Sequence, residues 1–179
     1  NKVIKEINVR LHPTAMALGE AGNKLFVVNS NSDLISVIDT RTFEITKTFS
    51  CKPYSDLPLG SSPTALSLSP DGTKLYIANG GNNALAVFDF GKDTLTGMIP
   101  TGWYPGAVAM NRAGTQLIVA NIKGVGGRAL NPEKKGYTSH DHLGSVSFIP
   151  VPDNKLLASY TSKAITNMNL PKIYRALKQ

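Results

Sequence analysis

The fold is decided by the stretch Pro63-Thr-Ala-Leu-Ser-Leu-Ser-Pro-Asp-Gly-Thr-Lys-Leu-Tyr-Ile-Ala-Asn79. Residues 12–29 and residues 104–121 align with residues 62–79 without a gap. Each stretch has Pro in second place, Gly in eleventh, Leu in fourteenth and a final Asn. The three prolines are 50 and 42 residues apart. A period of this length is typical of arrays of four-stranded blades. The sequence therefore predicts a repeat protein.

Each repeat contains the pattern of a β-hairpin. Residues 63–68 alternate apolar and polar side chains, as a strand with two different faces does. Residues 69–73 then supply a turn, because Pro presets φ, Asp bonds the backbone and Gly accepts a left-handed conformation. Residues 74–79, 84–89 and 94–99 follow as the second, third and fourth strands. One repeat thus predicts one four-stranded antiparallel sheet.

The same pattern divides the rest of the chain. The first unit places its third and fourth strands at residues 34–39 and 44–49, and the last unit places them at 146–149 and 155–160. We therefore predict an all-β chain of about three propeller blades plus one strand, which is part of a larger ring because propellers need about four to eight blades. The expected division is a strand at residues 1–10, whose blade lies upstream, blades at about 11–50, 61–100 and 103–161, and an exit linker with a short helix at 162–179.

A known repeat is visible in Pro70-Asp-Gly-Thr-Lys-Leu-Tyr-Ile-Ala-Asn79, with weaker copies at residues 26–29 and 118–121. These residues resemble the YVTN-type β-propeller repeat of surface-layer-like and other exported bacterial and archaeal proteins, and the resemblance covers roughly 160 of the 179 residues. It implies a ring that we expect to have seven blades, and a periplasmic, extracellular or cell-surface location.

A narrower resemblance is carried by Gly102-Trp-Tyr-Pro-Gly-Ala-Val-Ala109 and by residues 121–132 and 144–152. These segments resemble the late blades of bacterial proteins that join a YVTN propeller to a C-terminal phosphoesterase domain of the alkaline-phosphatase type. The resemblance implies that such a domain would follow this chain. None of that domain's metal-ligand motifs matches here, so no catalytic residue is carried over.

Composition excludes several classes of protein. No apolar run approaches the roughly 20 residues that span a bilayer. A single cysteine, Cys51, excludes an internal disulfide framework, and we interpret it as a free thiol in a loop between blades. The net charge of +7 is not concentrated in basic clusters interleaved with aromatic residues. A solvated surface explains this charge best, and binding of nucleic acid or an anionic polymer is the alternative.

Two insertions interrupt the repeat. About eight extra residues lie within 51–60, and about nineteen lie within 123–143. In an up-and-down blade, both insertions and the connection that carries Trp103 lie on one face of the disc, where propellers commonly bind ligands. The candidate recognition residues on this face are Tyr54, Asp56, Trp103, Tyr104, Arg128, Lys134, Tyr137, His140, Asp141 and His142. The alternative is that these loops cover the disc or contact a fused domain.

Only His140-Asp141-His142 has the character of a metal site, because two imidazoles two residues apart can face one ion. A third and fourth ligand cannot be assigned, so hydrogen-bonded loop histidines are the default interpretation and no cofactor is predicted. Residues 124–128 are rich in glycine, but the Lys-Ser/Thr of a phosphate-binding loop is missing. The asparagines that end the second strands are interpreted as backbone-bonding turn residues, and they are Asn29, Asn79 and Asn121.

Two functions from different classes remain open. The first is a non-catalytic module that scaffolds or binds a ligand or partner. The second is an enzyme like the propeller lactonases, which would need carboxylates and His or Asn around a divalent metal in the channel. Residues 14–18, 64–68 and 107–110 form the expected inner strands and contain no Asp or Glu. The sequence therefore favours the first function. We also expect apolar side chains such as Leu18, Val28 and Leu156 to be exposed at the ends of the arc, where further blades or another copy of the chain would pack.

Overall fold

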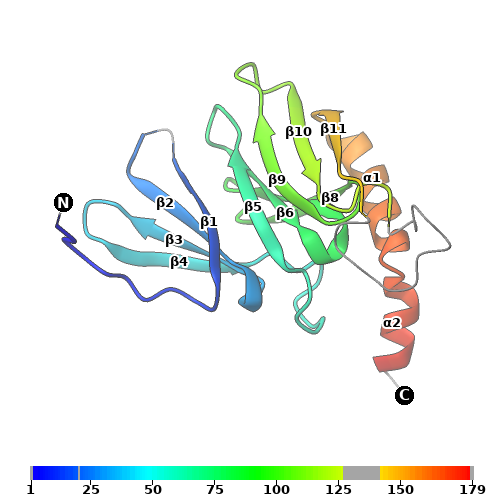
Figure 1. Cartoon of the computed structure of the whole chain (residues 1–179), viewed down its shortest axis with the longest axis horizontal. Helices are drawn as coiled ribbons and strands as arrows, with labels where there is room; N and C mark the ends of the chain where they lie inside the picture. Colours follow the sequence, from blue (N-terminus) through cyan, green and yellow to red (C-terminus); the bar gives the residue numbers. More distant parts are fainter. Residues whose placement is uncertain (1, 20, 127–141, 178–179) are drawn as a thin grey trace.

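The computed structural model describes residues 2–19, 21–126 and 142–177, and within them the chain forms three antiparallel sheets stacked in a row (Figure 1). The first sheet contains β1 (Pro13–Leu18), β2 (Lys24–Asn29), β3 (Leu34–Asp39) and β4 (Glu44–Ser50). The second contains β5 (Pro63–Leu68), β6 (Lys74–Asn79), β7 (Ala84–Asp89) and β8 (Thr94–Pro100). The third contains β9 (Pro105–Met110), β10 (Gln116–Asn121) and β11 (Ser145–Pro150). The three predicted blades are confirmed, with all four strands in the order expected for the first two and with the first three strands in the order expected for the third.

The predicted hairpin turn forms between β5 and β6. Gly72 has φ of +67°, in the left-handed region that glycine accepts without strain, and its N–H donates to the carbonyl of Ser69 at 2.9 Å. The Asp71 carboxylate accepts from the Ser69 hydroxyl and from the Thr73 N–H. These bonds, with that of Ser69 the strongest, lower the pKa of Asp71 to about 2. The turn therefore stays charged and closed at neutral pH.

Apolar side chains from facing sheets form the core. Phe26, Val28 and Ile35 of the first sheet meet Leu75 and Ile77 of the second. The other face of the second sheet packs on the third through Tyr76, Leu85, Val87, Leu117 and Val119. Val28 is fully buried, so the prediction that it lies on an exposed end face was wrong, because its side of β2 faces the second sheet. Leu18 and Leu156 are exposed as expected, at 57% and 41%.

The fourth strand expected at residues 155–160 was also wrong, because helix α1 (Asn154–Asn167) occupies this part of the chain. Asp153 caps the helix by accepting the Leu156 N–H at 2.7 Å. Leu157 and Ala164, seven residues apart on one helical face, are buried. Helix α2 (Leu170–Leu177) follows, in agreement with the expected short helix. None of the described helices is long and apolar enough to cross a membrane.

Helix α1 packs along β8 of the second sheet rather than extending the third sheet. The Thr161 hydroxyl accepts the Met98 N–H at 2.9 Å, so the helix satisfies a backbone donor on the outer edge of β8. A Cβ on Gly97 would come within 2.6 Å of this hydroxyl and 2.8 Å of Leu157 Cγ. Gly97 is therefore the place where α1 approaches β8 most closely.

Residues 2–9 were expected to form a strand, and this prediction was wrong for the isolated chain. They adopt no regular secondary structure, and Val3 and Ile4 are 72% and 80% exposed. A strand needs a neighbour for its backbone hydrogen bonds. In a four-stranded blade, this segment would pair with the third strand of the same blade, and the described residues include no such strand.

Candidate recognition face

The connections β2–β3, β4–β5, β6–β7, β8–β9 and β10–β11 all emerge at the same end of the antiparallel sheets. Within a blade, the segment that enters the first strand bonds through its backbone to the connection that follows the second strand. Gly80 N–H donates to Ser62 O at 3.0 Å, and Ile122 N–H donates to Tyr104 O at 2.9 Å. We call this end the loop face. On this surface, the residue before β5 is held by the β6–β7 connection, and the residue before β9 is held by the β10–β11 connection.

Two side chains on the loop face, one buried and one half-buried, form hydrogen bonds that join one blade to the next. The carboxylate of Asp33, 1% exposed, accepts the N–H groups of Gly60, Ser61 and Ser62 at 2.8–3.0 Å. Asn83, at the equivalent place in the second sheet, accepts the Tyr104 N–H at 2.8 Å through Oδ1. These bonds hold the segments that enter β5 and β9.

The locked residues have unusual backbone angles. Ser62 and Tyr104 have φ of 45° and 55°, although each precedes a proline and has a Cβ. A residue before proline normally stays in the extended region, and the left-handed region costs a residue with Cβ about 1–2 kcal/mol. Bonds to Asp33 and Asn83 offset this strain. The direction in which Tyr104 leaves the loop face is therefore fixed in the free protein.

The asparagines that end the second strands are fully buried, as hydrogen-bonding structural residues should be. The Nδ2 of Asn29 donates to Leu34 O at 3.2 Å, and the Nδ2 of Asn79 donates to Cys51 O at 2.7 Å. Asn121 instead donates to the hydroxyls of Ser145 and Ser147. The backbone-bonding interpretation holds for the first two. In all three the Oδ1 atom is buried without a hydrogen-bond partner among the described residues.

Trp103 and Tyr104 form an aromatic surface at the β8–β9 connection. Trp103 is 49% exposed, and its backbone N–H donates to Gly124 O at 2.7 Å. The Nζ of Lys123 lies 5.2 Å from the centroid of the Tyr104 ring, within the range of a cation–π contact. A Cβ on Gly102 would come within 2.5 Å of Gly124 O, so this position has room only for glycine. The surface therefore combines an exposed indole, a phenol ring and a positive charge on a fixed backbone.

Tyr54 and Asp56, the other described aromatic and acidic candidates, contact the C-terminal helix. The Tyr174 hydroxyl of α2 donates to Asp56 Oδ1 at 2.7 Å, and the Tyr54 and Tyr174 ring centroids are 5.7 Å apart, edge to face. Two causes raise the pKa of Tyr174 to about 12: the larger is the removal of the phenol from water, and the second is its contact with Asp56. Within the described ranges, no hydrogen bond, ion pair or ring contact joins this group to Trp103. The structure thus separates the predicted residues into two groups.

The remaining candidates belong to the long insertion. Arg128, Lys134, Tyr137, His140 and Asp141 lie outside the described residues, and His142 is half-buried just before β11. The described part of the chain brings no three of His, Cys, Asp and Glu together. Cys51 is fully buried, and this burial raises the pKa of its thiol strongly. A thiol that stays protonated is a poor nucleophile, so Cys51 fits the free structural thiol that the sequence predicts.

Sequence reasoning missed two pockets at the opposite end of the sheets. A pocket of about 430 Å³ lies between the first and second sheets, where Lys24 and Phe26 meet Leu68, Asp71 and Phe90. A second, of about 300 Å³, repeats the position between the next two sheets, at Lys74, Tyr76 and Gly114. Such pockets form only when sheets stack, so no local motif signals them. Asp71 borders both pockets, and its carboxylate accepts hydrogen bonds from Ser69 and Thr73 of its own turn.

Solved structures share this fold. They include hydrazine synthase from Kuenenia stuttgartiensis, with 22% identity, coverage of 67% of this chain and 33% of that chain, and a TM-score of 0.54. A protein from Bacteroides uniformis, provisionally assigned as a 6-phosphogluconolactonase, has 21% identity, covers 64% of this chain and 34% of its own, and has a TM-score of 0.55. A similarly assigned protein from Bacteroides fragilis has 22% identity, coverage of 61% and 32%, and a TM-score of 0.52. These likenesses show the fold alone, and this chain spans about a third of the length of each structure.

No curated protein matches the sequence. A family model does, and its description is "Lactonase, 7-bladed beta-propeller". It matches residues 12–124, which contain the first two repeats and the hairpin that opens the third. The expected seven-bladed propeller is thereby confirmed, and the phosphoesterase domain stays a prediction. The chain belongs to the seven-bladed β-propeller lactonase family.

Proposed function

We propose that this chain is a non-catalytic binding module of a β-propeller, and that it recognises a ligand or partner through Trp103 and Tyr104 on the loop face. The observation that carries the proposal is the half-exposed Trp103 side chain on a fixed backbone, in which the Trp103 backbone N–H donates to Gly124 O and the Tyr104 N–H donates to Asn83 Oδ1. A side chain held in place before binding loses little conformational freedom on binding. Exposed, rigid aromatic residues are also the usual anchors of recognition surfaces.

The charge of this surface supports a class of ligand. Lys123 places a cation beside the Tyr104 ring, and the whole chain carries a net charge of +7. Positive potential attracts anions over several ångströms at physiological salt. The module therefore fits an anionic group attached to a ring or another apolar face, which can stack on Trp103 while the charge approaches Lys123.

The chemistry of the other polar groups supports binding rather than catalysis. The buried carboxylate of Asp33 accepts three backbone N–H groups, so both of its oxygens have a structural role. Cys51 is buried, and its burial raises the pKa of the thiol. The first strands of the three described sheets contain no Asp or Glu that could face the channel. A nucleophile, a base and an electrostatic stabiliser are therefore not assembled within the described residues.

The sequence resemblance supports a second part of this proposal. Residues 102–109 and 144–152 resemble propellers that are followed by a phosphoesterase domain, and such proteins are exported. We infer that the module serves an exported bacterial protein with a phosphoesterase domain. Determining the full reading frame and intact mass, followed by fractionation of cells into periplasm and cytoplasm, tests this part independently of the binding site.

Calorimetry with the full-length protein tests the recognition surface. Three probes are used. Inorganic phosphate is the anion alone, 6-phosphogluconate carries it on a small polyol, and a heparin oligosaccharide carries anionic groups on a chain of sugar rings. Trp103→Ala and Tyr104→Ala should each weaken binding by about 1 kcal/mol or more. Thr73→Ala, at the opposite end of the sheets, should leave binding unchanged. Equal losses from both ends would show that the loop face is the wrong surface.

A second candidate is lactone hydrolysis, which the family match over residues 12–124 favours. In that case the catalytic groups would come from other blades or from the long β10–β11 connection. The test is hydrolysis of 6-phosphogluconolactone by purified chain with added divalent metal. Turnover that is lost on replacing His140 or His142 by Ala would support the enzyme and reject the non-catalytic module.

A further inference from the structure

The two pockets between neighbouring sheets lie at the end of the sheets that carries the β1–β2, β5–β6 and β9–β10 turns (Figure 1). We call the one between the first and second sheets the first pocket, and the one between the second and third sheets the second pocket. The hairpin of residues 63–79 forms a wall of the second pocket, and the aligned residues 13–29 form the same wall of the first. The two walls can therefore be compared position by position.

Three positions of this wall are polar in the second pocket and apolar in the first. They are Ser69, Asp71 and Tyr76 in the second pocket, and Gly19, Ala21 and Phe26 in the first. A fourth position is lysine in both pockets, as Lys74 and Lys24. The turn accounts for part of the difference, because the Ser69 hydroxyl donates to Asp71. It does not account for Tyr76, which lies within β6.

Tyr76 places a buried hydroxyl group at the second pocket. The residue is 2% exposed, and within the described ranges its hydroxyl forms no hydrogen bond. Removal from water, and to a smaller extent the charge of Asp71, raise the pKa of this phenol, so it stays protonated at neutral pH and can donate. Burial of a hydroxyl costs free energy unless it is hydrogen-bonded. The Tyr76 hydroxyl therefore favours a ligand that brings an acceptor into the pocket.

Lys74 adds a positive charge on the same side of the sheet. Strand alternation places its side chain on the face of Tyr76 and Ala78, which pack toward the third sheet. Lys74 is half-buried, whereas Lys24 in the first pocket is exposed. Among the described residues its ammonium group has no hydrogen bond or ion pair. An ammonium group and a phenol that both donate into one pocket match a carboxylate.

Asp71 adds a negative charge to this pocket. Its Oδ1 accepts the Ser69 hydroxyl and the Thr73 N–H, and the Thr73 hydroxyl lies 2.9 Å from Oδ2. A carboxylate has about four acceptor sites, so Oδ2 can accept a further donor. Within the described part of the chain Asp71 and Lys74 form no ion pair with each other. The two opposite charges are therefore separated along the pocket, an arrangement that is complementary to a zwitterion and unfavourable to a ligand with several negative charges.

The opposite wall limits the size of the ligand. Ala113 and Gly114 of the β9–β10 turn line it together with the half-buried Val151. A Cβ on Gly114 would lie 3.2 Å from Pro70 Cδ, so the two turns come close to each other beside the pocket. The pocket holds about 300 Å³, and this wall is made of small and aliphatic groups. It therefore fits a small aliphatic side chain.

We propose that the second pocket binds a small aliphatic α-amino acid as a zwitterion, with its carboxylate on the Lys74 ammonium and the Tyr76 hydroxyl and its own ammonium group on Asp71. This site lies at the opposite end of the sheets from Trp103 and Tyr104 and does not depend on the function proposed for the loop face. The anionic probes of the loop face have no ammonium group, so they do not report on this pocket.

Calorimetry of the full-length protein with L-valine tests the proposal, and saturable binding of one molecule is expected. Two analogues each lack one charge: 3-methylbutanoate has no ammonium group, and isobutylamine has no carboxylate. Each analogue should bind at least tenfold more weakly than L-valine. Tyr76→Phe, which introduces the residue that the first pocket has, should weaken L-valine binding at least fivefold, and Lys74→Met at least tenfold. Lys24→Met is the matched control in the first pocket and should leave the affinity unchanged.

The outcomes separate this site from the loop face and from a loss of folding. L-valine should leave the emission of Trp103 unchanged, and Tyr76→Phe should keep the circular dichroism spectrum of the wild type. The proposal is overturned if L-valine does not bind saturably, if Tyr76→Phe binds it as tightly as the wild type, or if Lys24→Met loses as much affinity as Lys74→Met. Binding of 3-methylbutanoate as tight as that of L-valine would also overturn it, because Asp71 would then not recognise an ammonium group.

Discussion

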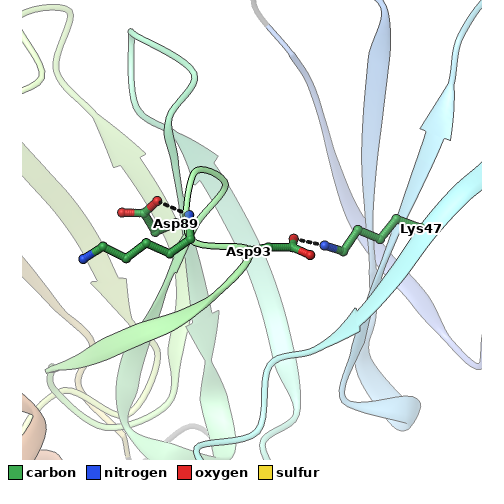
Figure 2. A network of polar contacts seen from close by, with 4 residues as sticks. Lys47, Asp89 and Asp93 are labelled. Atoms are coloured by element: carbon green, nitrogen blue, oxygen red, sulfur yellow. Dashed lines mark hydrogen bonds and ion pairs between the residues drawn. The ribbon is translucent and has the colours of Figure 1, made fainter.

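Lys47 of β4 and Asp93 of the β7–β8 turn form an ion pair that joins the first and second sheets (Figure 2). The Nζ of Lys47 also lies 5.3 Å from the Phe88 ring centroid and 5.8 Å from that of Phe49. These two rings stack on each other with centroids 4.0 Å apart. The pair therefore closes the outer end of a hydrophobic interface between two blades.

Replacing Lys47 should have a small, salt-dependent effect on stability. Both side chains are partly exposed, at 36% and 66%, and such pairs contribute about 0–1 kcal/mol. We expect Lys47→Met, which keeps most of the aliphatic stem, to lower the free energy of unfolding by less than about 1 kcal/mol. Urea denaturation in a double-mutant cycle with Asp93→Asn measures the coupling. A coupling that does not fall as salt increases would contradict this interpretation of the pair.

Asp33→Asn should destabilise the chain far more. An amide has one acceptor oxygen in place of two, and its NH₂ group would face backbone N–H donors that Asp33 now accepts. Hydrogen bonds to a buried charge contribute about 1.5–3 kcal/mol each, and we expect a loss of at least about 2 kcal/mol. Asp89→Asn is the control, because within the described ranges the Asp89 carboxylate accepts a single hydrogen bond, from the Lys92 N–H in an exposed turn. Similar losses of unfolding free energy in both variants would show that the hydrogen bonds of Asp33 do not stabilise the fold more than those of an exposed turn.

Gly102→Ala should disturb the aromatic surface. The new Cβ would lie 2.5 Å from Gly124 O and 2.7 Å from Asn121 Cγ, so the β8–β9 and β10–β11 connections must move apart. Such overpacking costs about 1–3 kcal/mol. The emission of Trp103, the sole tryptophan of the sequence, should shift at the same time. Gly91→Ala in the β7–β8 turn should leave this emission unchanged, and an equal shift there would contradict the local explanation.

The Tyr174 phenol should titrate above the ordinary pKa of a tyrosine. Its folded-state pKa of about 12 is above the ordinary value of 10.0, so the Tyr174–Asp56 contact stabilises the fold below pH 10. That contribution is lost as pH rises from about 10 to about 12. Absorbance at the phenolate band in wild type and Tyr174→Phe isolates this group. Asp56→Asn should lower the pKa of Tyr174, and a Tyr174 that ionises near pH 10 would show that α2 does not dock on Tyr54 and Asp56.

Much of the fold could be predicted because its signals are local. Pro70, Asp71 and Gly72 determine a turn within five residues, and the same turn repeats in each blade. Helix α1 could not be predicted in this way. Residues 155–160 fit a short strand as well as a helix, and the helix packs on β8, where Thr161 contacts Met98, 63 residues away.

The candidate site was predictable only in part. Strand direction alone places Trp103 and Tyr104 on the loop face, because alternate connections of an antiparallel blade share one end. The sequence contains no sign that Tyr174 contacts Asp56, 118 residues earlier. The pockets between sheets were missed for the same reason, since each needs side chains from two blades.

The emission of Trp103 reports directly whether a ligand binds at the loop face, because the sequence contains no other tryptophan. Full-length protein is titrated with inorganic phosphate, 6-phosphogluconate and a heparin oligosaccharide, while product formation is followed in parallel. We predict a saturable change in emission with a ring-bearing anion, at least fivefold weaker binding in Tyr104→Ala and unchanged binding in Thr73→Ala. We also predict no hydrolysis by the propeller chain alone. Saturable binding that leaves the emission unchanged, or no binding of any probe, would contradict it.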